Sequence, residues 1–213
     1  MYLPPATRQD DPAALHALMR EHGFAALVTH HGGGTSVSHL PFLIDAGSGP
    51  NGTLVAHMAR ANPHWKEFEG APESVVIFTG PHAYVSPSWY EQPQAVPTWT
   101  YAVAHAYGRP AVVEDEARAR EIVMRLVERH EAPLGKPWDA GAAAETIGRQ
   151  LAGIVAFEMR IERLEGKFKL NQGRSRADRE GVIRVLEASG DARQREVAAM
   201  MKAVLERPTK EAR

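Results

Sequence analysis

The chain of 213 residues contains no cysteine, which excludes disulfide bonds, thiolate metal ligands and a cysteine nucleophile together. It also lacks any apolar stretch approaching the roughly 20 residues that a membrane-spanning helix needs. Residues 1–5 have neither the basic region nor the apolar core of a signal peptide. These absences favour a cytoplasmic protein without a membrane segment.

The chain has little net charge, −1 at pH 7, so it is not a general polyanion binder. The distribution is uneven: residues 1–159 hold 11 Lys and Arg against 17 Asp and Glu, and residues 160–213 hold 14 against 9. Acidic residues interrupt the basic C-terminal part throughout. This pattern favours a solvated helical face, and DNA contact through the basic C-terminal helices is the weaker alternative.

Several motifs of catalysis and metal binding are missing. Ten histidines are present, but no two have the HExxH spacing and few carboxylates lie near them, so no metal site is predicted. Residues 86–89 lack the glycines of a serine-hydrolase nucleophile elbow. The chain contains no GxxxxGK[ST] phosphate loop and no GxGxxG turn that leads from a strand into a helix.

The first part of the chain predicts one helix and then many short strands. Asp11 is a fitting N-cap for a helix that Gly23 ends. Short apolar runs separated by turn residues favour an antiparallel barrel or sandwich over a parallel sheet. The predicted strands are residues 24–29, 37–44, 54–58, 75–79, 83–86, 98–107 and 110–114, with turns at 32–34, 47–52 and 80–81.

Helices dominate the second part. They are predicted over residues 115–130, 141–152, 177–188 and 191–206, and a strand pair, 154–164 with 167–170, is predicted around residues 165–166. In the last helix an apolar stripe at helical spacing is typical of core or dimer contact. We therefore predict a domain over residues 1–170 with a helical extension, residues 171–213, packed on it.

Residues 54–65 carry an anion-binding pattern. An apolar run leads into Arg60 and Asn62, and Pro63 follows at a position suited to the first turn of a helix. The free N–H groups of a new helix, its dipole and a neighbouring arginine suit an anion, typically a phosphate. A strand, a turn and a surface arginine explain the same residues, so this pattern alone leaves both interpretations open.

Two stretches combine aromatic rings with hydroxyl groups. Residues 84–90 and 96–101 hold Trp89, Tyr90 and Trp99 among serines, threonines and prolines. Such side chains can wall a planar ligand, or pack in a barrel core with their hydroxyls bonded locally. Residues 169–176 form a basic loop that can close over a polar ligand, lie at a dimer interface or cap the next helix.

Together these segments resemble the PaiB family, described as FMN-binding negative transcriptional regulators. The resemblance runs from residues 1–4 to residues 179–182, nearly the whole chain. It rests on the order and spacing of five segments, residues 38–42, 57–63, 80–90, 96–101 and 169–178. Three positions depart from the pattern: Thr100 and Gly173 replace asparagines, and Asn171 replaces a serine.

The resemblance implies a mainly β fold with helices, an FMN-binding split β-barrel with flanking helices and a helical C-terminal extension. It further implies a homodimer with FMN in a cleft between subunits. Residues 38–42 would run under the isoalloxazine ring, and substrate would stack near Trp89 and Tyr90. The implied cofactor-binding residues are Ser38, His39, Leu40, His57, Met58, Arg60, Asn62, Thr98, Trp99, Thr100, Lys169 and Gln172.

Three functions are compatible with this resemblance. The family description implies a flavin-binding regulator that lowers gene expression, although the sequence has no helix-turn-helix signature and no strongly basic recognition helix. An FMN-dependent oxidoreductase related to pyridoxamine-phosphate oxidases or flavin reductases is the second. A non-catalytic module that senses or stores FMN is the third.

Overall fold

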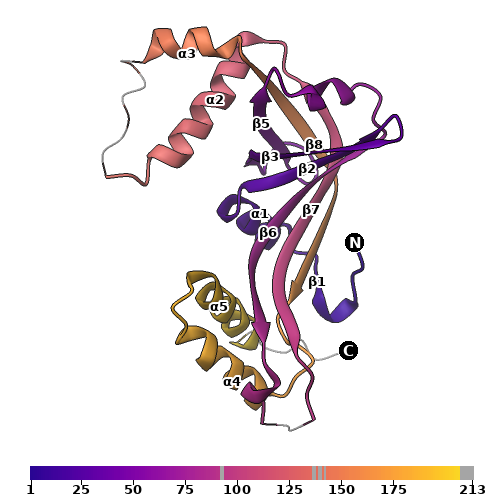
Figure 1. The fold of residues 1–213 in the computed structure, drawn as a ribbon, viewed down its shortest axis with the longest axis vertical. Helices are drawn as coiled ribbons and strands as arrows, with labels where there is room; N and C mark the ends of the chain where they lie inside the picture. The colour runs from indigo at the N-terminus through magenta and orange to yellow at the C-terminus, as the bar shows by residue number, and fades with distance from the viewer. Residues whose placement is uncertain (92–93, 136–137, 139–140, 142, 207–213) are drawn as a thin grey trace. The chain divides into compact units, whose positions relative to one another are not determined.

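The computed structural model describes residues 1–91, 94–135, 138, 141 and 143–206. Its chain divides into two compact units. The larger unit comprises residues 12–78 and 105–164, and the smaller one comprises residues 1–11, 79–104 and 165–213. Strands β6 (Ser74–Val85), β7 (Thr98–Val112) and β8 (Ile154–Lys169) contribute residues to both units (Figure 1). The division predicted at residue 170 stays a prediction.

The strands form one eight-stranded sheet in the order β3-β2-β6-β7-β8-β5-β4, and β1 (Arg8–Gln9) pairs with β8. The other members are β2 (Phe24–His31), β3 (Gly34–Pro41), β4 (Leu43–Asp45) and β5 (Thr53–Ala59). The pairs β2–β3, β2–β6, β4–β5 and β5–β8 are antiparallel. Within the larger unit β3 also contacts β5, so this part of the sheet curls on itself. The predicted antiparallel architecture is confirmed.

Three predicted strand breaks, at residues 80–81, 108–109 and 165–166, are wrong, because each lies inside one long strand. Gly80 with Pro81 is buried within β6, and Gly166 pairs with Gln9 inside β8. Gly108 lies inside β7, where an added Cβ would stand 2.2 Å from the Arg160 carbonyl oxygen. Gly108 thus marks a close approach of two backbones, a role that a strand glycine shares with turn formation.

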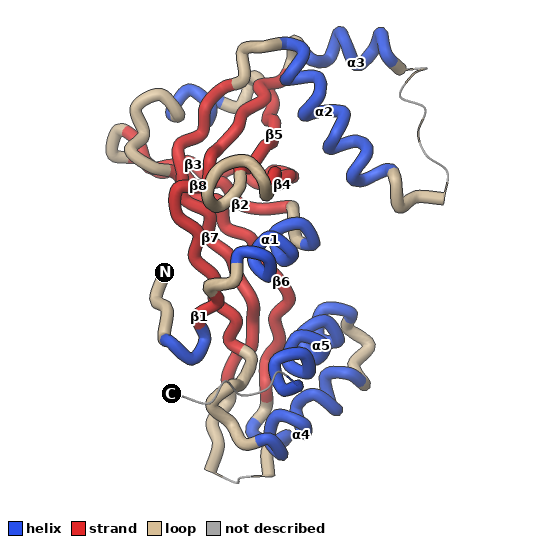
Figure 2. Tube along the Cα trace, turned by 180° about the vertical axis from the view of Figure 1, so that it is seen from behind, coloured by secondary structure: helices blue, strands red, loops and turns tan. Residues whose placement is uncertain are grey.

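Five helices lie where the sequence predicts them, within about three residues (Figure 2). Asp115 and Ser175 act as N-caps of α2 and α4, accepting from the Arg118 and Asp178 N–H groups. Within the described residues, no helix combines the length and apolar character needed to cross a membrane. The helices are α1 (Pro12–Glu21), α2 (Glu116–Glu131), α3 (Ala144–Leu151), α4 (Arg176–Glu187) and α5 (Ala192–Glu206).

Each unit has its own core. In the larger unit the Phe42 ring lies 6.0 Å from those of Phe78 and Phe157, with edge-to-face geometry. In the smaller unit α4 packs against α5, where Val197 and Met201 of the predicted apolar stripe are fully buried. That part of the stripe therefore serves the core of its own chain.

Gly108→Ala should destabilise the protein by about 3 kcal/mol, because the new methyl group would overlap backbone that cannot move independently of the sheet. Urea unfolding measures the change in the free energy of unfolding. Gly47→Ala is the matched control, since an added Cβ at Gly47 meets nothing within 4 Å. Equal stability of the two variants would contradict the close approach of β7 to β8.

Candidate functional site

Ser38, Asn62 and His64 form a polar network in the larger unit. The Ser38 Oγ lies 2.8 Å from the His64 Nδ1 and accepts a hydrogen bond of 3.0 Å from the Asn62 Nδ2. The Asn62 Oδ1 accepts from the His64 backbone N–H at 3.1 Å. Ser38 and His64 are buried, so this network fixes the turn after β5 against β3. Two predicted site residues, Ser38 and Asn62, are thus brought together.

The start of the helix after Asn62 differs from the prediction. Pro63 opens a 3₁₀ helix of five residues, Pro63–Glu67, and the Asn62 side chain already occupies its first N–H group. A helix this short has a small dipole and few free donors. Any anion binding at this turn must therefore come from side chains.

Part of the Arg60 guanidinium is already hydrogen-bonded within its own chain. Its Nε and Nη2 donate hydrogen bonds of 2.8 Å to the carbonyl oxygens of Ala152 and Ile154. Its backbone carbonyl accepts from the Trp65 indole N–H at 3.1 Å. The side chain is exposed and lines a cavity of about 270 Å³ between α3 and the end of β7. These bonds orient the guanidinium, which keeps further N–H groups for a ligand.

His57 lies on β5 at the wall of an open groove of about 710 Å³. Its Nδ1 is buried and has no hydrogen-bond partner among the described residues. Burial lowers the pKa of the His57 imidazole below its ordinary value of 6.5, which keeps the ring neutral at pH 7. The other lining residues are Pro41, Leu126, Val127, His130, Glu131 and Trp138.

The remaining predicted residues of the larger unit lie on different faces, because side chains alternate along a strand. His39 is exposed, and its ring stacks on Phe24 at 6.4 Å. Leu40 is half-buried. Met58, next to His57, is 2% exposed and belongs to the core. Of the neighbours His57 and Met58, therefore, only His57 lines the groove.

The predicted residues of the smaller unit form a second group. The Lys169 ammonium donates to the Thr98 hydroxyl at 2.6 Å. Gln172 folds back on its own turn, where its Oε1 accepts from the Leu170 N–H at 2.8 Å. Trp99 is 54% exposed and contacts the rings of His82 and Tyr84.

Thr100, Asn171 and Tyr90 make a buried network in the same unit. The Thr100 hydroxyl donates to the Asn171 Oδ1 at 3.4 Å, and the Asn171 Nδ2 donates to the Tyr90 hydroxyl at 3.2 Å. Arg174 stacks on the Tyr90 ring at 4.7 Å. Trp89 is half-buried, and its carbonyl oxygen would lie 2.5 Å from a Cβ at Gly181. Tyr90, expected beside a substrate, is thus enclosed by its own unit.

The groove beside His57 fits a flavin ring. Its volume lies within the roughly 300–1,000 Å³ of small-molecule sites, and Pro41, Leu126, Val127 and Trp138 give it an apolar wall. The unpartnered Nδ1 of neutral His57 can bond the polar edge of a heterocycle. No group of three metal-ligating side chains occurs in the described part of the chain.

Sequence reasoning missed His64 and the wall that α2 contributes. The nearest signal for the wall is the helical spacing of Leu126 and His130 on a helix predicted over residues 115–130. For His64 the sequence offers only its place after Pro63.

Comparisons with known proteins agree with this chemistry. Residues 1–163 match the family described as "Putative FMN-binding domain". The Bacillus subtilis protein named "Protease synthase and sporulation protein PAI 2" is 30% identical over 203 residues, covering 94% of this chain and 96% of the relative. The fold matches two solved structures of low identity, and it is the split β-barrel that the resemblance implied.

The first of these structures is a conserved hypothetical protein of Mycobacterium tuberculosis, with a TM-score of 0.58 and 10% identity. The match covers 82% of this chain and 94% of the Mycobacterium tuberculosis chain. The second is an FAD and heme binding protein of Mycobacterium smegmatis, with a TM-score of 0.55 and 16% identity; it covers 76% of this chain and 73% of its own. At these identities the two structures establish the fold alone.

Stability should fall below about pH 6.5 partly because of His64. Burial lowers the pKa of its imidazole below the ordinary 6.5, although Glu67 partly opposes this. The unfolded chain therefore binds the proton more readily than the folded one, and stability is lost as the pH falls through 6.5. Urea unfolding between pH 8 and pH 5 should give a shallower pH dependence for His64→Gln than for the wild type.

Ser38→Ala is the control for this prediction. It should lower stability by about 1 kcal/mol through lost hydrogen bonds but keep the pH dependence, since the titrating ring remains. An unchanged slope in His64→Gln would assign the effect to other groups.

Proposed function

The chain belongs to the family of FMN-binding domains, and from this premise we propose that it is an FMN-binding negative regulator of transcription of the PaiB type. The groove with its unpartnered His57 Nδ1 is the observation that carries the assignment of the flavin site. The name of the Bacillus subtilis relative includes sporulation, which is a cellular programme. A regulatory role for this chain fits that name.

The larger unit supplies the main contacts in this proposal. FMN, when bound, supplies electron-transfer chemistry that amino-acid side chains lack. His57 would bond the polar edge of the ring, and α2 with Trp138 would keep water from one side of it. Arg60, held by the Ala152 and Ile154 carbonyls, would offer its remaining N–H groups to the phosphate. Ser38 and Asn62 would hold the turn between them.

We propose that the protein works as a homodimer and that the residues of the smaller unit complete the site. Two exposed apolar surfaces support dimerisation: Phe24 and Val37, 70% and 54% exposed on β2 and β3, and Trp99 in the smaller unit. Thr98, Trp99, Lys169 and Gln172 would then face the flavin from the partner subunit.

Direct DNA contact is the less favoured route to regulation. Residues 171–206 hold seven Lys and Arg against six Asp and Glu, and three of the basic side chains form ion pairs within the chain: Arg176 with Glu180, Arg193 with Asp191 and Lys202 with Glu187. Such pairing leaves little unbalanced positive charge to release counterions from DNA. A regulator that acts through a partner or a metabolite fits this charge pattern better.

The first experiment is a visible absorption spectrum of the full chain after it has been mixed with FMN and desalted. We expect oxidised-flavin bands at about one FMN per chain, with the mass of a dimer by light scattering. Reduction of the bound flavin by NAD(P)H, followed by its substrate-dependent reoxidation, would favour the oxidoreductase function over the regulatory one. A colourless protein would refute the flavin site itself.

Arg60→Ala should weaken FMN binding by about 1.5–3 kcal/mol, the scale of a lost charged hydrogen bond. Riboflavin lacks the phosphate, so its affinity should change little in the same variant. Titrations with both ligands, followed by flavin fluorescence, give the ratio of the two dissociation constants. A ratio equal to that of the wild type would exclude Arg60 as the phosphate ligand, whatever the variant does to stability.

His57→Leu should weaken both FMN and riboflavin by about 1 kcal/mol, since a ring contact is independent of the phosphate. The same titration measures it. His30→Gln is the matched control, because His30 is an exposed strand histidine bonded to Thr35. Equal affinities in His57→Leu and the wild type would place the flavin elsewhere.

A further inference from the structure

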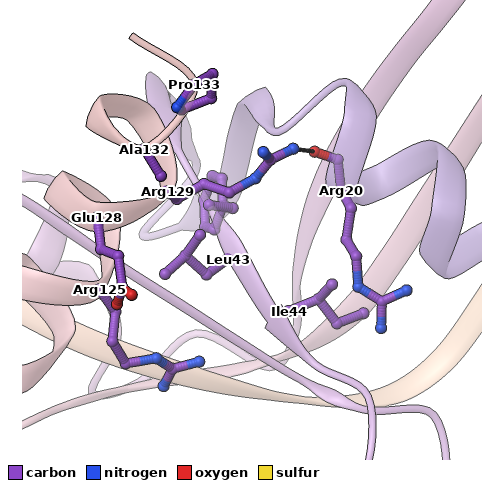
Figure 3. A pocket seen from close by; sticks show the side chains of 9 residues that line it. Arg20, Leu43, Ile44, Arg125, Glu128, Arg129, Ala132 and Pro133 are labelled. Atoms are coloured by element: carbon purple, nitrogen blue, oxygen red, sulfur yellow. Dashed lines mark hydrogen bonds between the residues drawn. The ribbon is translucent and has the colours of Figure 1, made fainter. Parts of the chain in front are cut away.

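A third cavity, of about 400 Å³, lies in the larger unit, between the end of α1, β4 and the C-terminal half of α2 (Figure 3). Its apolar lining is Phe42, Leu43 and Ile44 with Ala132 and Pro133. Its polar lining is Arg20, Arg125, Arg129 and Glu128. None of these side chains lines the groove of His57, and among them only Phe42 lies in a segment, residues 38–42, that is predicted beside the flavin ring.

The three arginines of this cavity differ in the hydrogen bonds and ion pairs that their guanidinium groups form within the chain. Arg125 forms a two-pronged ion pair with Asp45, with a distance of 3.0 Å from its Nη1 to the Oδ2. Arg129 uses its Nη2 to donate to the Arg20 carbonyl oxygen at 3.0 Å (Figure 3). The Arg20 guanidinium has no hydrogen bond or ion pair among the described residues, and Figure 3 shows it beside Ile44.

The charges of the cavity leave an excess of one positive charge. Asp45 balances Arg125, and Glu128 is the one carboxylate among the lining residues of Figure 3. Arg20 and Arg129 together therefore exceed Glu128 by a single charge. A monoanion would neutralise this excess positive charge, whereas a phosphate dianion would give the cavity a net negative charge.

We propose that this cavity binds a small organic carboxylate with an apolar body. Arg20 would form a charge-assisted, planar pair with the carboxylate, a geometry that guanidinium favours. Phe42, Leu43, Ile44 and Pro133 would contact the hydrocarbon part, whose transfer from water stabilises the complex. The volume lies within the range of small-molecule sites. This proposal does not depend on FMN binding.

Calorimetric titration of the full chain with decanoate tests the proposal. We expect one site per chain, with acetate and decanol each binding at least tenfold more weakly, because acetate lacks the apolar body and decanol lacks the charge. Arg20→Met should weaken decanoate about tenfold, the scale of one charge-assisted hydrogen bond. Methionine keeps the apolar stem and the Arg20 carbonyl that Arg129 needs.

Arg149→Met is the matched control, because Arg149 is an exposed arginine of α3 that does not line the cavity. It should bind decanoate like the wild type. Absence of decanoate binding, or equal binding by Arg20→Met, would overturn the site. Equal binding of decanol would overturn the role of the charge, and tighter binding of hexyl phosphate would overturn the carboxylate assignment.

Discussion

The anchoring of α2 is the constraint on which all three cavities described in the larger unit depend, since α2 supplies a wall to each. Ile122 and Leu126 pack on Val55 and Ala156 of the sheet, and burial of this apolar cluster stabilises the contact between the helix and the sheet. Around it, Arg118 bonds Glu158 of β8 at 2.7 Å, and Arg125 holds Asp45 of β4. These ion pairs are about one third exposed, so each contributes at most about 1 kcal/mol. Their fixed partners nevertheless set the position of the helix along its axis.

The register of β5 decides which side chains the groove receives. His57 pairs with Ala156 and Met58 with Val155, so His57 faces the groove while Met58 faces the core. A slip of one residue would bury the imidazole and expose the thioether, which the apolar core resists. The chemistry of the groove is therefore tied to the same packing that holds α2, because Ala156 is the partner of His57 across the strands and Val55 lies two residues before His57 on β5.

Much of the fold could be predicted from local sequence, and much of the site could not. Apolar spacing gave the helices, whereas the N-caps Asp115 and Ser175 emerge only from the structure. Gly108 was taken as a break because a glycine signals a turn and a close strand contact alike, and only the partner at Arg160 distinguishes them. The anion-binding pattern placed Arg60 and Asn62 near a ligand. It could not predict the hydrogen bonds of Arg60 to Ala152 and Ile154, because these two residues lie about ninety positions further along the chain. The contribution of α2 to the groove is likewise a tertiary effect that periodicity does not specify.

Three positions of this chain depart from the PaiB pattern. The changes at positions 100 and 171 compensate for each other, whereas the change at position 173 is not compensated. The amide missing at position 100 is restored on the other side of the same network, where Asn171 accepts from Thr100 and donates to Tyr90. Asn171 has a positive φ of 59°, a conformation that asparagine adopts more readily than serine, so the backbone also favours the exchange. Gly173 has no such counterpart, because an added Cβ there meets nothing within 4 Å. Of the two lost amides, the one at position 173 is therefore the change that removes a hydrogen-bonding group from the smaller unit.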